Sequence, residues 1–373
     1  MIGTIMFLTA LVTDISFGAR IRFLTAVHER DEAKAYWLGV TGVNLYRLVL
    51  LANKQLGENS VLSEMGLGDS LWQTLPFINT GLLRMFIASD GDLEEDEVTE
   101  FEQSGQVSDE VREESAETTT RFGSRNFLDF DGDFMAQVTG EECGINVNRL
   151  YTRSADTRPE DTTTGKQLLG LMSGEENDAW LRERNIERLD LIGNLADWVD
   201  ADTNVASGKG GYEDDFYNSQ PQPYLAKNAR FDTRTELRLV EGWQDEVYDR
   251  WAAQLTIYGN GKINITCADD VVLAGLLQAH LTPRPTDQEV AAIIALVRDY
   301  MSGASFKSGS DFVDYLKNQG YSPDDELAGE VSIKTNVFTV TSTGTVGDAT
   351  AQITAVIDYT SSSGGTVLYW RVD

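Results

Sequence analysis

The chain has 373 residues, 41% of them hydrophobic, which is enough for two or three domains with buried cores. Its 60 Asp and Glu outnumber its 30 Lys and Arg, so the formal net charge is −30. This charge argues against a nucleic-acid partner, because phosphate contacts need Lys and Arg, and it favours cation binding and solubility.

The first expected element is one long helix over residues 2–54. Residues 1–13 are almost wholly apolar, the pattern then continues as that of an amphipathic helix, and no proline precedes Pro76. An apolar run of this length is shorter than the roughly 20 residues that span a bilayer. We therefore expect further apolar residues upstream in the natural protein, or packing of this segment among similar helices. A pair of helices broken near Gly18 or Gly39 is the alternative.

Residues 90–117 form an acidic block that holds 13 Asp and Glu against one base, Arg112. Such blocks usually remain solvated, so we expect a disordered loop, with calcium capture as the alternative. After this block, alternating apolar residues and turns at Gly132 and Gly140 predict two short strands within residues 127–148.

The two cysteines, Cys143 and Cys267, lie in similar short segments that have the pattern of strands. If these strands are neighbours, a disulfide is possible and implies an oxidising compartment; two buried free thiols are the alternative. The two histidines, His28 and His280, have no partner at ligand spacing, so neither a His-based zinc site nor a catalytic triad is expected.

Helical periodicity predicts an all-α module over about residues 152–255, with helices within 166–198 and 235–253. Three more helices are expected over residues 269–281, 286–301 and 310–319. Thr286 and Glu289 have the spacing of a capping box at the start of the second of these helices.

The last part of the chain changes to a period of two, with Val, Ile, Thr and Tyr alternating between glycine turns. Three antiparallel strands are expected over residues 331–342, 349–359 and 366–372, preceded by a short strand at 263–265. Three strands need a cover, and the N-terminal helix is the only amphipathic element of adequate length. The predicted fold class is α+β: a pilin-like long N-terminal helix packed on an antiparallel sheet, with a large inserted all-α region.

The sequence therefore divides into five predicted segments. These are an N-terminal membrane and assembly helix (1–55), the first part of the pilin-like domain including the acidic loop 90–117 (56–150), an inserted α-helical domain with an acidic cation-binding loop (151–262), a second helical module (263–325) and the C-terminal strands that complete the pilin-like domain (326–373).

Short motifs along nearly the whole chain occur in an order that points to one family. They are Arg30–Ala33, Tyr36–Gly39, Gly144–Asn148, Asp197–Asp202, Glu213–Tyr217, Pro223–Tyr224, Asn228, Glu236–Gly242, Tyr258–Gly259, Ile263–Ile265 and Trp370–Arg371. The most specific stretch runs from Asp197-Trp198-Val199-Asp200-Ala201-Asp202 to Glu213-Asp214-Asp215-Phe216-Tyr217. In these motifs the chain resembles the K-type minor pseudopilins of bacterial type II secretion systems, the general secretion pathway protein K family.

The resemblance implies a non-enzymatic protein that caps the tip of a pseudopilus and starts its assembly, promoting protein export. It implies I- and J-type minor pseudopilins as partners, bound through bundled N-terminal helices and the pilin domain. The resemblance also implies a single-pass anchor in the bacterial inner membrane, a globular part in the periplasm, and an inserted SAM-like α-domain. Two features depart from the family pattern: the sequence lacks the prepilin-type leader before the helix, and the acidic block 90–117 is not typical.

The acidic stretch also predicts a calcium (Ca2+) site, and the family is calcium-associated in this region. Calcium prefers six to eight oxygen ligands, and Asp200, Asp202, Glu213 and Asp214 could supply most of them. The spacing resembles the start of an EF-hand loop but lacks its turn glycine, where Val205 stands. A solvated acidic loop held by aromatic residues is the alternative.

Two other functions remain open from the residues. One is a minor pilin at the tip of a type IV pilus, serving adhesion or assembly. The other is a hydrolase that uses pairs among Asp197, Asp200, Glu213 and Asp214 as general acid and base. The crowding of these acids in one loop, without a usable histidine, argues against the hydrolase.

Overall fold

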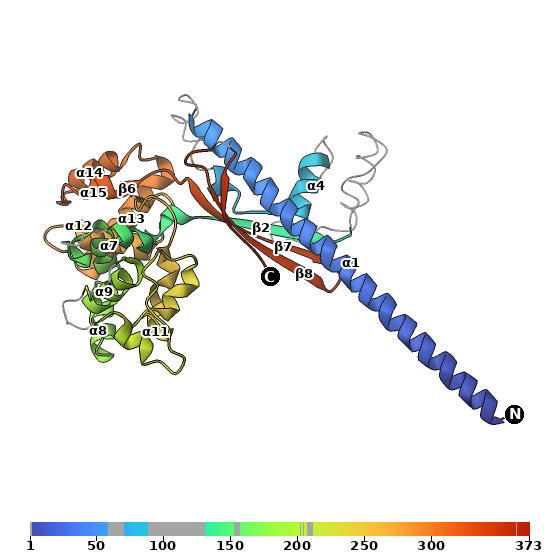
Figure 1. Cartoon of the computed structure of the whole chain (residues 1–373). Helices are drawn as coiled ribbons and strands as arrows, with labels where there is room; N and C mark the ends of the chain where they lie inside the picture. The colour runs from blue at the N-terminus through green and yellow to red at the C-terminus, as the bar shows by residue number, and fades with distance from the viewer. Residues whose placement is uncertain are drawn as a thin grey trace. The chain divides into compact units, whose positions relative to one another are not determined.

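The computed structural model describes residues 2–58, 71–88, 131–152, 157–201, 203, 205–206, 212–362 and 364–373. The acidic block 90–117 lies outside these residues. The chain forms two compact units: one contains the N-terminal helix and the main sheet, and the other contains residues 140–338 of the described chain (Figure 1). The five predicted segments are finer than this division and stay a prediction.

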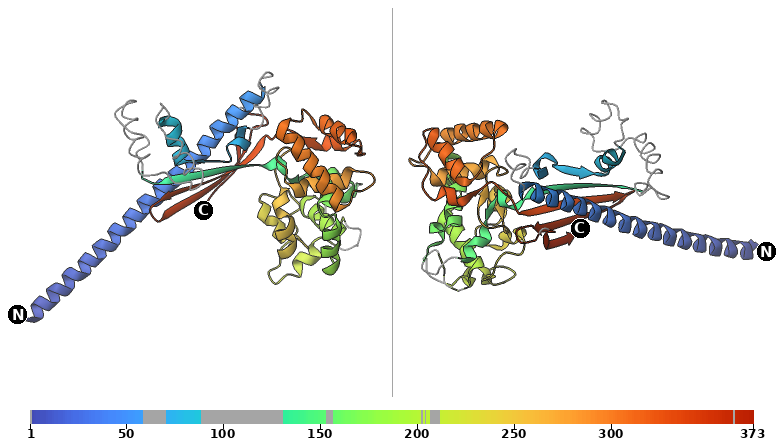
Figure 2. Two further views of the ribbon diagram at one scale, coloured as in Figure 1. Left: turned by 180° about the vertical axis from the view of Figure 1, so that it is seen from behind. Right: turned by 90° about the horizontal axis from the view of Figure 1, so that it is seen from above.

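The first unit is built on helix α1 (Ile2–Glu58), which confirms the single long helix over the broken pair. From residue 35 onward, one side of α1 is buried, at Ala35, Val43, Tyr46 and Leu50. The spacings between these residues are eight, three and four positions, which place them on one face of a helix. Between Met6 and Leu24 the large apolar side chains of α1 are exposed, and Figure 2 shows this part of the helix extending beyond the sheet.

The buried face of α1 lies on the late strands, as predicted. Strand β7 (Val337–Val346) and strand β8 (Ala349–Asp358) approach the helix so closely that side chains would not fit at several glycines. A Cβ placed on Gly42 would lie 2.2 Å from the Ser342 hydroxyl oxygen, and one placed on Gly344 would lie 2.0 Å from the Ala35 carbonyl oxygen. Glycine at position 344 therefore allows the backbones of sheet and helix to meet, and glycine at position 42 makes room for side chains of the sheet against the helix.

Among the described residues, the main sheet has five strands in the order β1-β2-β7-β8-β9. The additional elements are α3 (Leu71–Thr74), β1 (Phe77–Asn79), α4 (Thr80–Ala88), β2 (Asp133–Gly140) and β9 (Thr366–Val372). β1 pairs antiparallel with β2, and β8 pairs antiparallel with β9. The three predicted late strands are thus present, and two earlier strands extend the sheet.

One strand prediction needs correction. The expected strand 331–342 is divided, because β6 (Val331–Ser332) pairs in parallel with β5 (Ile263–Asn264) before β7 begins. The two strands expected within 127–148 are present as β2 and β3 (Ile145–Asn146), and β3 pairs in parallel with β4 (Leu255–Thr256), a partner that the sequence did not indicate. In both cases the partner is far away in sequence, which a local pattern does not reveal.

The second unit is mainly helical, as the periodicity predicts. Its helices are α7 (Thr163–Leu171), α8 (Glu175–Glu183), α9 (Arg188–Val199), α10 (Asp214–Asn218), α11 (Asp245–Trp251), α12 (Asp270–His280), α13 (Asp287–Gly303), α14 (Gly309–Asn318) and α15 (Leu327–Glu330), with 3-10 turns η2 (Glu141–Cys143), η3 (Val147–Thr152), η4 (Pro159–Asp161), η5 (Arg234–Leu239) and η6 (Ala252–Gln254). One continuous apolar core joins them. The predicted capping box is present: Thr286 accepts from the Glu289 amide, and Glu289 accepts from the Thr286 amide.

Cys143 and Cys267 form a disulfide in this unit, with their Cα atoms 5.3 Å apart. The structure therefore decides between the two alternatives that the sequence left open. The two cysteine segments are close, but each pairs with a different strand, since β3 joins β4 and β5 joins β6. The disulfide links parts of the chain 124 residues apart, and such long-range links stabilise a fold mainly by restricting the unfolded chain.

Candidate functional site

An aromatic cluster lies where the acidic stretch leaves helix α9. Trp198 is buried, and its ring centroid lies 5.4 Å from that of Tyr217, 6.4 Å from Tyr224 and 6.3 Å from Phe231. Burial raises the pKa of Tyr217, whose hydroxyl oxygen accepts a hydrogen bond from the Glu241 amide. The neutral rings hold the two ends of the acidic stretch against the core, which matches the predicted anchoring by aromatic residues.

The four predicted calcium ligands are placed differently. Asp200 follows the last turn of α9 and is 7% exposed, and Glu213 precedes α10 and is 6% exposed. Asp214 is half-buried, and its Oδ1 accepts from the Ala226 amide at 2.9 Å. Asp202 lies outside the described residues. Nearby Asp197 is also buried, and its Oδ1 accepts from the Ala206 amide at 2.7 Å.

The donor chemistry of this site fits calcium. Asp200 and Glu213 are carboxylates held out of water, where a negative charge is stable only with compensation from a cation or hydrogen bonds, and carboxylate oxygens are the ligands that calcium prefers. Within the described ranges, however, no group of three or more His, Cys, Asp or Glu side chains has the arrangement of a metal site. The structure therefore brings two of the four predicted residues into buried positions, and the full ligand set stays a prediction.

The sequence did not reveal a second buried polar cluster, around His280. Its Nδ1 lies 3.0 Å from both carboxylate oxygens of Asp324, and its Nε2 lies 3.0 Å from Oε2 of Glu330. Burial acts to lower the pKa of His280, but the two carboxylates outweigh it and raise that pKa above its ordinary value. The two carboxylates lie 44 and 50 residues after His280 in the sequence, so a search for partners at short spacing from His280 could not find them. The cluster fastens the end of α12 to the segment that leads into β6.

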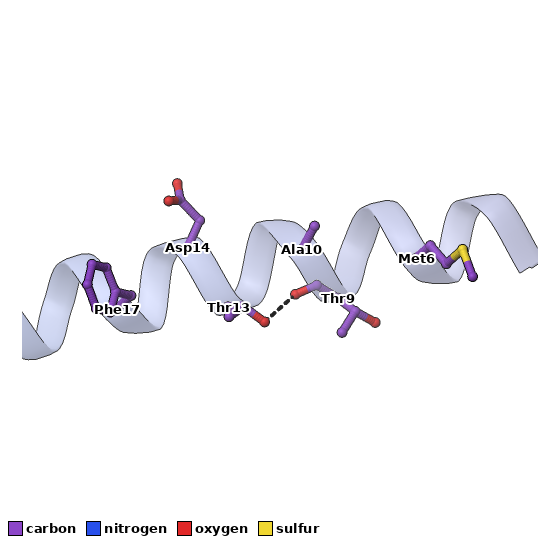
Figure 3. A pocket seen from close by; sticks show the side chains of 6 residues that line it. All are labelled: Met6, Thr9, Ala10, Thr13, Asp14 and Phe17. Atoms are coloured by element: carbon purple, nitrogen blue, oxygen red, sulfur yellow. Dashed lines mark hydrogen bonds between the residues drawn. The ribbon is translucent and has the colours of Figure 1, made fainter.

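The exposed part of α1 forms a third candidate surface. Figure 3 shows six side chains along this part of the helix: Met6, Thr9, Ala10, Thr13, Asp14 and Phe17. The Thr13 hydroxyl donates to the Thr9 carbonyl within the helix, at 2.8 Å, so this polar group is satisfied locally. By length and composition, α1 contains within residues 6–57 a stretch that is compatible with a single membrane anchor.

A long N-terminal helix packs on an antiparallel sheet, and a helical unit is inserted between β2 and β7. These features define a pilin-like fold with a large inserted domain. Residues 143–260 match the family model described as type II secretion system (T2SS), protein K. This range contains the Trp198 cluster and both ends of the acidic stretch. The resemblance to the protein K family that the motifs indicated is thereby confirmed.

Individual proteins agree with this result. The type II secretion system protein K of Pseudomonas aeruginosa is 25% identical over 223 residues, which are 59% of this chain and 59% of that protein. The protein of the same name from Klebsiella pneumoniae is 23% identical over 261 residues, 67% of this chain and 74% of that protein. The chain thus aligns with about three fifths of the length of the Pseudomonas relative.

The fold also matches a solved structure, the GspK-GspI-GspJ complex of the enterotoxigenic Escherichia coli type 2 secretion system. The TM-score is 0.52 at 16% identity, and the match covers 81% of this chain and 93% of the chain it matches. At this level of identity the similarity shows the fold alone. It confirms the predicted α+β class.

Proposed function

We propose that the chain is a non-enzymatic minor pseudopilin that caps the tip of a type II secretion pseudopilus and starts its assembly. The observation that carries this proposal is the division of α1. Its second part is buried on β7 and β8, whereas its first part exposes large apolar side chains. Exposed apolar surface of this extent is stable only in a membrane or against other apolar helices.

The partners that fit this surface are two other minor pseudopilins of the I and J types. In the solved relative, GspK is part of a complex with GspI and GspJ. For this chain, we infer that the exposed part of α1 bundles with the equivalent helices and that the first unit contacts their pilin domains. The large second unit, inserted between β2 and β7, is expected to prevent a further subunit from adding beyond it, as a cap requires.

A location in the inner membrane with the globular part in the periplasm agrees with two features. α1 is compatible with a single anchor. The Cys143–Cys267 disulfide belongs to oxidising compartments, of which the periplasm is one.

The hydrogen bonds of the acidic side chains support a role without catalysis. Asp197 and Asp214 each accept a hydrogen bond from a backbone amide, which fixes them as parts of the fold. We propose that Asp200, Asp202, Glu213 and Asp214 bind calcium and thereby hold the acidic stretch in one conformation, not that they act on a substrate.

Co-purification tests the proposed assembly. The full chain, expressed with the I- and J-type subunits of its own secretion system, is expected to elute from detergent as a 1:1:1 complex. Replacing Phe7 and Leu11 with serine should abolish the complex, because both belong to the exposed part of α1. The matched control is Leu239→Ser, an exposed apolar position in η5 of the second unit, which should leave the complex intact.

Two results would contradict the proposal. One is a wild-type chain that stays alone in the presence of both subunits. The other is recovery with the minor pilins of a type IV pilus instead, which would favour that alternative.

A further inference from the structure

Strand β9 has an open side. Among the described strands it is the last in the main sheet, with β8 as its neighbour. All of its residues are at least partly exposed, including four large apolar ones with exposed fractions of 39–47%: Val367, Leu368, Trp370 and Val372. A strand edge with exposed apolar side chains is a template for pairing with another strand.

The hydrogen-bond pattern shows which backbone groups face this open side. Gln352 and Asp373 exchange both of their backbone hydrogen bonds, at 2.9 and 2.8 Å. In an antiparallel pair such hydrogen-bonded positions alternate with positions that direct their N–H and C=O groups away from the neighbour. Counting back along β9 from Asp373, Val372 lies opposite Ile353 and Trp370 lies opposite Ala355. The backbone groups of Val372 and Trp370 therefore point toward the open side. Arg371, between them, points its backbone groups toward β8.

The side chains at these two positions extend an existing apolar surface. Val372 lies beside Ile353, whose side chain is buried under α1 next to Gly39, and Trp370 lies beside the buried Ala355. Side chains of directly opposite residues lie on the same face of a sheet. A register shift between Val356 and Ile357 interrupts the pairing further back along β9. The regular open edge is thus the last part of β9.

We propose that this edge, Trp370 to Val372, receives the edge strand of a second pilin-like subunit, which joins the sheet as its next strand. The inference rests on the proposed function, because it describes a second contact, between sheets, with a partner whose N-terminal helix packs beside α1. α1 lies close to β9 at both ends of the strand: the Arg47 side chain donates to the carbonyl of Gly364, just before β9, at 3.2 Å, and Gly39 of α1 contacts Ile353, the residue opposite Val372. A partner helix packed along α1 therefore brings the partner's sheet toward this edge.

Charge indicates that the partner is a different protein and not a second copy. A second copy would carry the same formal charge of −30, and such net charges repel. The edge itself is balanced, since Arg371 and Asp373 form an ion pair at 2.7 Å. The strand that fits is extended, free of proline at the pairing positions, and apolar opposite Trp370 and Val372.

Amide hydrogen exchange tests the inference on the full wild-type chain, alone and in complex with its I- and J-type subunits. The amides of Trp370 and Val372 are expected to exchange at least about tenfold more slowly in the complex, because the partner strand covers them. The Arg371 amide, already bonded to β8, should change little and serves as the internal control. A complex that forms while both outward amides exchange as in the free chain would overturn the inference and leave the proposed function standing.

A pair of matched variants tests the side chains. Val372→Lys places a charge on the open edge and is expected to weaken the complex about tenfold. Val271→Lys introduces the same change at 46% exposure on α12, in the other unit, and should have no effect. Equal affinities for the two variants, both with wild-type unfolding temperatures, would contradict the inference. If the wild-type subunits form no complex at all, the result contradicts both the inference and the proposed function.

Discussion

Among the single residues, the buried His280 and the two carboxylates beside it hold separate segments together. His280 is fully buried between Asp324 and Glu330, which come from the segment leading to β6. Gln167 on α7 also donates to Glu330, at 3.2 Å. The cluster thus joins α7, α12 and α15 through hydrogen bonds to charged groups, which are stronger than those between neutral groups.

The His280 cluster should make stability depend on pH. Because the folded-state pKa of His280 is raised above 6.5, protonated His280 stabilises the fold below about pH 6.5, and this contribution is lost as the pH rises through the folded pKa. The difference in free energy of unfolding between wild type and His280→Gln should therefore shrink from pH 6 toward alkaline pH. Denaturant unfolding across that range measures it. A difference that stays constant with pH would show that the charge of His280 does not contribute.

Calcium binding can be tested at the same scale. Calcium should raise the unfolding temperature of the wild type, and Asp200→Asn should abolish that rise, because it replaces a buried carboxylate with a neutral amide. Glu187→Gln, an exposed acid just before α9, is the control and should keep the rise. Thermal unfolding with and without calcium measures the effect. The site would have to be given up if the wild type shows no calcium-dependent shift.

At the scale of elements, the contact between α1 and the sheet depends on the absence of side chains. Gly42 lies against Ser342, with Ala136 and Phe134 also close, whereas Gly18 of the same helix has open space around it. Overpacked contacts cost about 1–3 kcal/mol, while alanine in an exposed helix is favoured over glycine by roughly 0.5–1 kcal/mol.

These two glycines form a matched pair of substitutions. Gly42→Ala is expected to lower the free energy of unfolding of the first unit by about 1–3 kcal/mol. Gly18→Ala should leave it unchanged or slightly raised. Chemical denaturation of the purified chain in detergent measures both. If Gly42→Ala is as stable as Gly18→Ala, the close approach of helix and sheet is not as the structure shows.

At the scale of the whole molecule, the two compact units have separate cores. The second unit buries a large apolar cluster of its own, and the first buries residues of α1 against β2, β7 and β8. The second unit also contains the disulfide, which links positions 143 and 267 within it. Units with separate cores are expected to unfold as separate cooperative transitions.

Calorimetry should accordingly show two unfolding transitions. Gly42→Ala is expected to shift only the transition of the first unit, and His280→Gln only that of the second, because each residue lies within one core region. One transition that both variants shift equally would mean that the two units unfold together.

Elements whose signal lies in neighbouring residues could be predicted from the linear pattern. The long helix α1 was predicted from helical spacing of apolar residues and the absence of proline. The late strands were predicted from alternating residues between glycine turns, and the start of α13 from the Thr286–Glu289 capping box. At the candidate site, the motifs around Trp198 indicated the family and the anchoring rings. Local backbone preference and the face that must be buried are properties of neighbouring residues, so a linear pattern contains them.

The features that join distant segments could be seen only in the folded chain. The pairing of β3 with β4 and of β5 with β6, the disulfide, the partners of His280 and the open side of β9 all depend on which segments meet in space. A strand of two residues is too short for its sequence to specify its partner strand. The sequence around a histidine also gives no sign of a contact with an acid some fifty positions away. Such contacts are fixed by the packing of the whole core, because each segment is stable there only when the others are in place.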